Sequence, residues 1–306
     1  MSAAPVLPLI TVVALCHNHA RFLRPALDSI LAQTYANLEV ILVDDGSTDE
    51  SAAVLREYAA AHPEWQTLFL EKNIGNCTAF NLALARTHGQ YVIDFATDDV
   101  LLPERVARQV AVFEELPADY GMVYSNVRLI DEAGQFQRLF YTPTAGQLRP
   151  MPATGWVFEQ VLRRFFISAP SMMMRRATVE ALGGYDETLA YEDFDFWVRA
   201  SRHWQFYFQN EVLTEKRLHS RSKSAQSYRP HDPLVASTVR ICRKAAALCR
   251  TPAEWDALAV RVRWELRQAV RWGNLSAARQ LYALLHDIKR VGWLDRGIGL
   301  YLKLKG

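Results

Sequence analysis

Two patterns of apolar and polar residues alternate along the first third of the chain. Short continuous apolar runs, rich in β-branched residues, predict buried strands over residues 8–15, 38–43, 66–70 and 91–96. Between them, apolar residues recur every three or four positions, which predicts helices over residues 22–33, 50–61 and 78–87 and from Pro103 onward. This succession of strand-then-helix units predicts an α/β fold, with a mostly parallel sheet, helices on both faces and right-handed crossovers.

The regular alternation ends near residue 120. Residues 121–130 and 135–141 flank the turn sequence DEAG and predict a hairpin. Residues 142–155 hold three Pro and two Gly and are expected to form a loop. A short helix over residues 156–164 and a strand over residues 171–175 are expected next. From Pro233 to the end the spacing is helical, with breaks expected at Thr251–Pro252, Gly273–Asn274 and Gly292.

Charge is unevenly distributed along the chain. Residues 232–306 contain 14 Lys or Arg against 6 Asp or Glu, a net charge of +8, whereas residues 1–231 carry −6, so that the whole chain has +2. Half of the residues are apolar and 22% are charged, which allows a sizeable core and argues against disorder. We therefore expect one α/β domain over residues 1–231 and a basic α-helical extension over residues 232–306.

Several features of the sequence suit the cytoplasm. No window approaches 18 uninterrupted apolar residues, so a membrane-spanning helix is not expected. The first residues lack a basic segment ahead of the apolar run, and we do not interpret them as a signal peptide. The four cysteines form no CxxC pair and no zinc spacing, which suits a reducing compartment. Cys242 and Cys249 are expected on one helical face, in the core.

The stretch VDDGSTDE, residues 43–50, joins the second expected strand to the helix that follows it. Gly46 allows a tight turn, and Ser47, Thr48 or Asp49 can cap the helix. Capping explains one acid or hydroxyl, but it does not explain two adjacent carboxylates, Asp44 and Asp45, at the carboxyl end of a strand. In open α/β sheets, ligands bind at that end of the strands.

Two more clusters of acidic residues occur along the chain. Asp98 and Asp99 come directly after the strand over residues 91–96, and Glu192, Asp193 and Asp195 open a helix. The helix dipole favours acids at a helix N-terminus by roughly 0.3–1 kcal/mol each, which offers a structural explanation for Glu192 and Asp193. A site with several carboxylates and no His/Cys set suits Mg²⁺ or Mn²⁺, which takes further ligands from phosphates and water. No GxGxxG follows the first strand and no GxxxxGK[ST] is found, which counts against dinucleotide and P-loop sites.

Four blocks of the sequence, in order, resemble the family-2 glycosyltransferases, which have a GT-A fold. The blocks are ITVVALCHNHARFLRPALDSILAQTYANLEVILVDDGSTDES, KNIGNCTAFNLALARTHGQYVIDFATDDVLLPERV, GGYDETLAYEDFDFWVRA and RLHSRSKS, within residues 8–225. The resemblance implies inverting transfer of a sugar from a nucleoside diphosphate donor, UDP or dTDP, to a hydroxyl acceptor. It further implies a Mg²⁺ or Mn²⁺ cofactor and a saccharide or lipid-linked saccharide acceptor, in the synthesis of cell-surface polysaccharide, lipopolysaccharide or capsule.

The resemblance also assigns roles to individual residues. Asp193 corresponds to the general base that takes the proton of the acceptor hydroxyl. Asp45 corresponds to the acid that accepts the ring N–H of the base. The residues that would bind the nucleotide are Leu15, His17, Asn18, Asp45 and Asp98. The residues that would bind the metal are Asp98, Asp99 and His219, and the choice between the two acids is open. The residues that would form the donor and acceptor pocket are Gly75, Asn81, Gly184, Tyr185 and Glu192.

Structural alternatives stand beside several of these roles. His17 could stack on the base or be a strand-end histidine in a satisfied hydrogen bond. The pair Gly183–Gly184 could end a helix as well as shape the acceptor side. His219 could contact the metal or a phosphate, or be a solvated loop residue.

The sequence departs from the family at two positions. Ala96 replaces the first acid of the DxD element, and Phe80 stands where an Arg usually precedes Asn81. These departures keep open a second function, a GT-A domain that binds a nucleotide sugar or partner without turnover. A nucleotidyltransferase would require a basic Gly-rich loop after the first strand, which CHNHARF is not. Because no QxxRW element is found, we expect one sugar per encounter.

Three interpretations of the basic C-terminal helices are open. Their Arg residues could form the solvated face of a bundle that packs on the catalytic domain or makes a homodimer contact. They could instead form a patch that attracts anionic lipid at the inner membrane surface. Nucleic-acid binding is not expected, because no recognised motif supports it.

Overall fold

The computed structural model describes residues 7–149 and 151–305. The chain forms two compact units. The first, which we call the sheet unit, contains the residues up to 155 together with 166–188 and 204–218. The second, the helical unit, contains residues 156–165, 189–203 and those from 219 onward. The assignment of residues 1–231 to a catalytic domain and of residues 232–306 to an extension stays a prediction.

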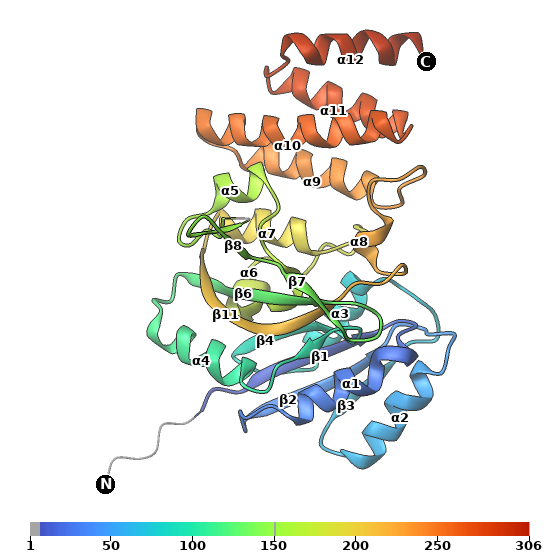
Figure 1. Cartoon of the computed structure of the whole chain (residues 1–306), viewed down its shortest axis with the longest axis vertical. Helices are drawn as coiled ribbons and strands as arrows, with labels where there is room; N and C mark the ends of the chain where they lie inside the picture. Colours follow the sequence, from blue (N-terminus) through green and yellow to red (C-terminus); the bar gives the residue numbers. More distant parts are fainter. Residues whose placement is uncertain (1–6, 150, 306) are drawn as a thin grey trace. The chain divides into compact units, whose positions relative to one another are not determined.

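One large sheet organises the sheet unit, in the order β3-β2-β1-β4-β10-β6-β11-β5. The four strands predicted first are confirmed and run parallel to one another: β1 (Ile10–Cys16), β2 (Leu38–Asp44), β3 (Gln66–Phe69) and β4 (Tyr91–Ala96). Figure 1 shows β2, β1 and β4 side by side. The sheet is completed by β5 (Val100–Leu101), β6 (Tyr120–Ile130), β10 (Met173–Arg175) and β11 (Gln205–Arg217). The predicted hairpin is confirmed as β6 paired antiparallel with β7 (Phe136–Leu139).

Helices cover both faces of this sheet, as predicted. On one face lie α1 (Ala20–Leu31), α2 (Ser51–Ala61) and α4 (Arg105–Glu115), and on the other α3 (Asn76–Leu84) and α6 (Arg176–Ala181). The alternation of side chains along β1 explains this arrangement. Val12 and Ala14 share one buried cluster with α1, α2 and α4, whereas the hydroxyl of Thr11 accepts a hydrogen bond from Arg176 of α6.

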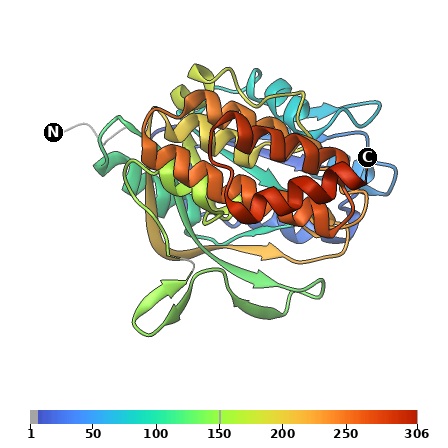
Figure 2. The ribbon, with the colours of Figure 1, turned by 90° about the horizontal axis from the view of Figure 1, so that it is seen from above.

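The prediction of a loop over residues 142–155 is partly wrong. β8 (Thr142–Thr144) and β9 (Gln147–Arg149) form a small antiparallel hairpin, seen in light green in Figure 2, and Pro150 lies outside the described residues. Ala145 and Gly146 join the strands with φ of +48° and +76°. A two-residue turn requires such positive φ values, and Asn or Asp usually precedes the Gly. Ala145 gives no such signal, which is why the sequence did not predict the turn.

The helical unit contains the remaining helices. They are α5 (Phe158–Arg163), α7 (Asp193–Ser201), α8 (Lys223–Gln226), α9 (Val235–Leu248), α10 (Pro252–Arg271), α11 (Leu275–Asp287) and α12 (Trp293–Leu304). The predicted breaks are confirmed, and Figures 1 and 2 show α9 to α12 packed side by side. Thr251 and Glu254 form a capping box at the start of α10, with Pro252 in its first turn. The expectation that Cys242 and Cys249 share one helical face is wrong. The chain is already extended before the cap of α10, so Cys249 lies just after the end of α9.

None of the described helices is both long enough and apolar enough to cross a membrane.

Buried charges connect the helices of this unit. The carboxylate of Asp195 in α7 pairs with Arg199 one turn later, at 2.6 Å, and with Lys244 of α9, at 2.7 Å. Arg261 and Glu265 of α10 form a second buried pair, and Tyr228 donates to Glu265 at 3.0 Å. Burial raises the pKa of Glu265. Because buried charges are costly without partners, the Asp195 contacts specify how α7 meets α9, and the contact from Tyr228 specifies how the segment after α8 meets α10.

Asp195→Ala should lower the free energy of unfolding by about 3 kcal/mol, because it leaves two cations without their buried acceptor. The side chain of Asp195 is 1% exposed. The matched control is Asp256→Ala, whose side chain is 62% exposed and pairs with Arg290; its cost should stay below about 1 kcal/mol. Denaturant titration followed by circular dichroism measures both, and equal costs would contradict the structural role of Asp195.

Candidate functional site

The carboxyl ends of three parallel strands meet at one edge of the sheet. Cys16 of β1 is in register with Asp44 of β2, and Leu15 is in register with Ala96 of β4. The segments that leave the sheet here are residues 15–18, 44–47 and 96–99, which we call the strand-end cluster. Leu15, His17, Asn18, Asp45 and Asp98, the predicted nucleotide set, all lie in it.

Asp45 joins the end of β2 to the loop that precedes α3. The residue is 3% exposed, and its carboxylate accepts the backbone N–H of Ile74 at 2.8 Å and of Gly75 at 3.1 Å. Each carboxylate oxygen keeps a second lone pair for another donor. Asp45 therefore holds Gly75, a predicted pocket residue, beside the strand-end cluster.

The turn after Asp45 has little room. The φ of Gly46 is +63°, and a Cβ at this position would lie 2.2 Å from the backbone carbonyl carbon of Lys72. The carboxylate of Asp44 accepts the N–H of Ser47 at 3.2 Å and so orders the turn. Asp49 accepts the N–H of Ser51 at 2.9 Å in the turn that precedes α2, whose N-cap residue is Glu50. The motif VDDGSTDE thus has a local structural basis that does not depend on a ligand.

His17 and Asn18 connect the loop that follows β1 to the loop that follows β2. Nδ1 of His17 lies 2.8 Å from the carbonyl oxygen of Asp45; because a carbonyl only accepts, this nitrogen carries the proton. Nε2 then accepts from the Asn18 amide at 3.1 Å. Asn18 has a φ of +59°, and its side-chain oxygen accepts the N–H of Thr48 at 2.8 Å. The structural alternative for His17 is therefore realised, and its stacking on a base stays a prediction.

Asp98 and Asp99 lie in different environments. Asp99 is buried, and its carboxylate accepts the N–H of Arg217 at 2.8 Å. Burial, with the neighbouring charge of Asp98, raises the pKa of Asp99 well above its usual range. Asp98 is half-buried, and its carbonyl accepts from Nε of Arg217 at 3.0 Å. Oxygen ligands suit Mg²⁺ or Mn²⁺, which proteins hold through one or two carboxylates; no group of three or more His, Cys, Asp or Glu that could hold a metal occurs among the described residues.

Asn81, Gly184 and Tyr185, three predicted pocket residues, are brought together. The Asn81 amide donates to the carbonyl of Tyr185 and accepts its N–H, both at 2.9 Å. A Cβ on Gly184 would lie 2.5 Å from the Asn81 side-chain oxygen, so only glycine fits. The hydroxyl of Tyr185 donates to Asp94 at 3.1 Å, and its ring stacks on Phe80 at 4.3 Å.

The Gly183–Gly184 pair also ends α6. The N–H of Gly184 bonds the carbonyl of Val179, and that of Gly183 bonds the carbonyl of Glu180, both at 2.9 Å. This is the Schellman arrangement, with both glycines at positive φ. The structural alternative for these glycines is confirmed.

The other predicted residues, Glu192, Asp193 and His219, belong to the helical unit. Asp193 is the first residue of α7 and Glu192 its N-cap residue, as expected for acids at a helix N-terminus. The carboxylate of Asp193 accepts the N–H of Phe194 at 2.6 Å. The carbonyl of His219 accepts the N–H and the hydroxyl of Ser222. The catalytic and metal-binding roles of these three residues stay predictions.

Some residues that hold the strand-end cluster were missed from the sequence. Thr97 donates through its N–H and its hydroxyl to the carbonyl of Leu15, and its hydroxyl lies 3.0 Å from Nδ1 of His19. Its position in ATDD was a signal that could have found it. Arg217 could not be found, because its contact with Asp98 and Asp99 depends on how the distant strand β11 pairs.

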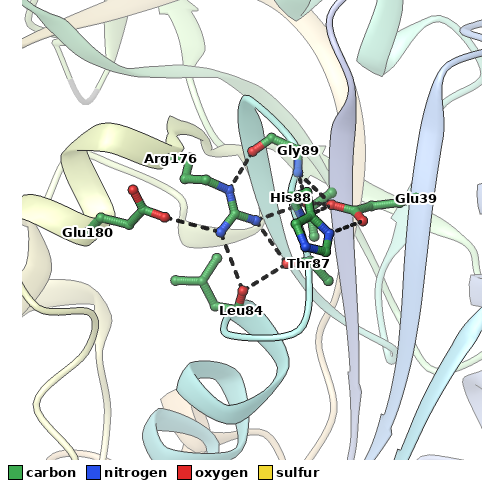
Figure 3. Close-up of polar contacts among 8 residues, drawn as sticks. Glu39, Leu84, Thr87, His88, Gly89, Arg176 and Glu180 are labelled. Atoms are coloured by element: carbon green, nitrogen blue, oxygen red, sulfur yellow. Dashed lines mark hydrogen bonds and ion pairs between the residues drawn. The ribbon is translucent and has the colours of Figure 1, made fainter.

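A surface cleft of about 440 Å³ lies elsewhere in the sheet unit, lined partly by Asn81, His88, Arg176 and Glu187. Figure 3 shows why Arg176 cannot readily bind a ligand there: its guanidinium donates to Gly89, Leu84, Thr87 and Glu180. Thr11, Glu39 and Gly89, which complete this network, lie at or before the amino ends of β1, β2 and β4, opposite the strand-end cluster.

Comparisons with known proteins agree with this architecture. The chain is 29% identical over 222 residues to an uncharacterized glycosyltransferase of Rickettsia prowazekii (strain Madrid E), covering 70% of this chain and 65% of that protein. It is 30% identical over 196 residues to the putative glycosyltransferase EpsE of Bacillus subtilis (strain 168), covering 63% of this chain and 66% of that protein. The chain thus spans just under two thirds of the length of each relative.

Solved structures share the fold at low sequence identity. S. aureus TarS 1–349 in complex with UDP-GlcNAc has a TM-score of 0.66 and 16% identity, covering 92% of this chain and 80% of that chain. The mannosyltransferase PcManGT from Pyrobaculum calidifontis, in complex with GDP-Man and Mn²⁺, has a TM-score of 0.58 and 20% identity, covering 99% and 82%. The predicted GT-A fold is confirmed.

The profile of the family described as Glycosyl transferase family 2 matches residues 11–182, more than half of the chain. This segment contains β1 from its second residue onward, β2 to β4 and the entire strand-end cluster. The chain therefore belongs to glycosyl transferase family 2.

Proposed function

We propose that this protein is an inverting glycosyltransferase that moves a sugar from a nucleoside diphosphate donor to a hydroxyl acceptor. The observation that carries the proposal is the meeting of His17, Asp45 and Asp98 at one sheet edge, within the segment that matches the family. Ligands of open α/β sheets bind at this end of the strands.

Asp45 is proposed to select the base of the donor. Its carboxylate is fixed by two backbone N–H groups and keeps lone pairs that can accept a ring N–H, which uracil and thymine offer. We therefore favour UDP or dTDP as the nucleotide. Leu15, His17 and Asn18 would form the rest of this wall, with Gly75 held close by through Asp45.

Asp98 and Asp99 are proposed to hold Mg²⁺ or Mn²⁺, with His219 as a further ligand or a donor to phosphate. A bound cation would neutralise the charge that develops on the departing diphosphate. The half-buried Asp98 offers its carboxylate more readily than Asp99, which is turned toward the N–H of Arg217. Arg217 would keep both acids in place through its contacts with each of them.

Asp193 is proposed as the general base. It would take the proton from the acceptor hydroxyl as that oxygen attacks the anomeric carbon opposite the leaving group, which inverts the configuration. Glu192, Asn81, Gly184 and Tyr185 are proposed to shape the donor and acceptor pocket.

The acceptor is proposed to be a saccharide or lipid-linked saccharide of cell-surface polysaccharide, lipopolysaccharide or capsule synthesis. We place the protein in the cytoplasm, with peripheral contact with the inner membrane surface. None of the four cysteines, all of which the structure describes, forms a disulfide, which suits a reducing compartment.

Asp193→Asn should reduce the rate of transfer by about 10²- to 10⁴-fold, the usual contribution of a general base. Binding of the nucleotide sugar should change little, because the amide keeps the shape of the side chain. Initial rates of nucleotide release and calorimetric titration measure the two quantities. Asp287→Asn, an exposed acid in α11, is the matched control. If Asp193→Asn transferred sugar at the rate of the control variant, Asp193 would not be the general base.

A second function, binding of a nucleotide sugar without turnover, is favoured by two residues. Ala96 replaces an acid of the metal element, and Phe80, where the family usually has an Arg, is buried against Tyr185. A phosphate contact from position 80 is therefore not expected.

Thermal unfolding with UDP and Mn²⁺ separates the two functions. A ligand at 100 times its Kd stabilises the native state by about 2.7 kcal/mol, which gives a measurable rise in Tm. The proposal expects that Mn²⁺ strengthens the UDP-induced rise, that Asp98→Asn removes this increase, and that UDP-sugars are turned over. A Tm rise with no hydrolysis or transfer across many acceptors would favour the binding module.

A further inference from the structure

The last helix, α12, turns an apolar face to solvent. Trp293 is 80% exposed and Leu304 is 79% exposed, and Leu294, Leu300 and Tyr301 are also exposed. At 3.6 residues per turn, Trp293, Leu300 and Leu304 lie within roughly 40° of one another, and Leu294 and Tyr301 adjoin them on one side. These five residues form a continuous stripe, which we call the α12 stripe.

The opposite face of α12 is fixed to the helical unit, so the stripe faces outward by construction. The buried carboxylate of Asp295 accepts from Nε of Arg263 in α10 at 2.9 Å and from the N–H of Gly292 at 2.8 Å. Gly299 lies so close to Tyr282 of α11 that a Cβ would be 2.4 Å from its hydroxyl oxygen. Leu302 is buried on the same side. Turning the helix to bury the stripe would break these contacts.

Cations border the α12 stripe and acids do not. Arg296 and Lys303 are exposed along one margin, and Lys305 follows at the other. The acid within α12, Asp295, is buried on the inner face, so the outward face, whose residues from 293 to 304 are all described, carries no carboxylate. An apolar stripe with aromatic residues and flanking cations is the pattern of a helix that lies in a membrane interface.

We propose that α12 is an interfacial helix that docks the protein on an anionic lipid surface. Its 12 residues extend about 18 Å, too short to span a hydrocarbon core of about 30 Å, so the helix would lie in the membrane plane. The stripe would enter the boundary between headgroups and acyl chains, and Arg296, Lys303 and Lys305 would face lipid phosphates. Trp293 and Tyr301 suit the headgroup level, where an apolar ring and a polar group are both satisfied.

A second copy of the chain fits this face less well. A two-fold interface would bring identical faces together, so the cations of one copy would meet those of the other with no carboxylate between them. Residues 232–306 carry a net charge of +8, which adds to repulsion between copies and to attraction toward anionic lipid.

Vesicle flotation with the 306-residue chain tests the proposal. The protein should bind vesicles that contain phosphatidylglycerol at least about tenfold more tightly than vesicles of phosphatidylcholine alone. Added salt should weaken this binding, because it screens charges beyond about 10 Å. Equal binding to both vesicles, or no binding to either, would overturn the proposal.

Two double variants assign any binding to α12. Arg296→Glu with Lys303→Glu should weaken binding to anionic vesicles at least about tenfold. Leu300→Ser with Leu304→Ser should weaken it similarly, by removing the inserted apolar surface. Matched controls are Arg86→Glu with Arg138→Glu, and Leu31→Ser with Phe136→Ser, all exposed residues of the sheet unit that should leave binding unchanged.

Further measurements keep the outcomes distinct. Because the changed side chains are exposed, circular dichroism and Tm should be unchanged. Binding that all four variants retain would remove α12 from the interaction. A dimer seen by sedimentation velocity, absent in Leu300→Ser with Leu304→Ser and accompanied by no vesicle binding, would assign the stripe to a second copy. Vesicle binding involves no step of sugar transfer, so its failure would leave the proposed sugar transfer untouched and would remove only the proposed contact with the inner membrane surface.

Discussion

The parallel register of β1 with β2 and β4 is the constraint on which the candidate site depends. It brings Leu15, Asp44 and Ala96 to one edge, so the segments after them must share that space. Hydrogen bonds then fix these segments to one another: Asp45 holds the loop at Ile74 and Gly75, and Asn18 holds Thr48. A site of this kind is organised before any ligand arrives, which lowers the entropic cost of binding.

The local sequence pattern predicted the strands and helices of the first third of the chain, because the spacing of apolar side chains within each segment determines whether it is a strand or a helix. The breaks between the C-terminal helices were also predictable, since Pro252, Gly273 and Gly292 are strong local signals. The hairpin over β8 and β9 was missed because Ala145 takes a positive φ that only its structural context imposes. The supporting role of Arg217 was missed for a different reason, because it depends on pairing between distant strands.

The candidate site was only partly predictable from the sequence, again because of contacts between distant segments. The acids at the strand ends were found from sequence, whereas their partners were not. Asp45 and Asp99 accept backbone N–H groups from segments about 30 and more than 100 residues away, respectively. Such contacts give these acids a structural role beside the proposed functional one. Two structural roles also coincide at Gly183–Gly184, which ends α6 and fits against Asn81.

The most direct test of the central claim is a crystal structure of the protein with UDP and Mn²⁺. We expect the base beside Asp45 and His17 and the diphosphate next to Asp98, with the hydrogen bonds from Ile74 and Gly75 to Asp45 retained. A nucleotide bound instead in the cleft beside Arg176, with the strand-end cluster unchanged, would contradict it.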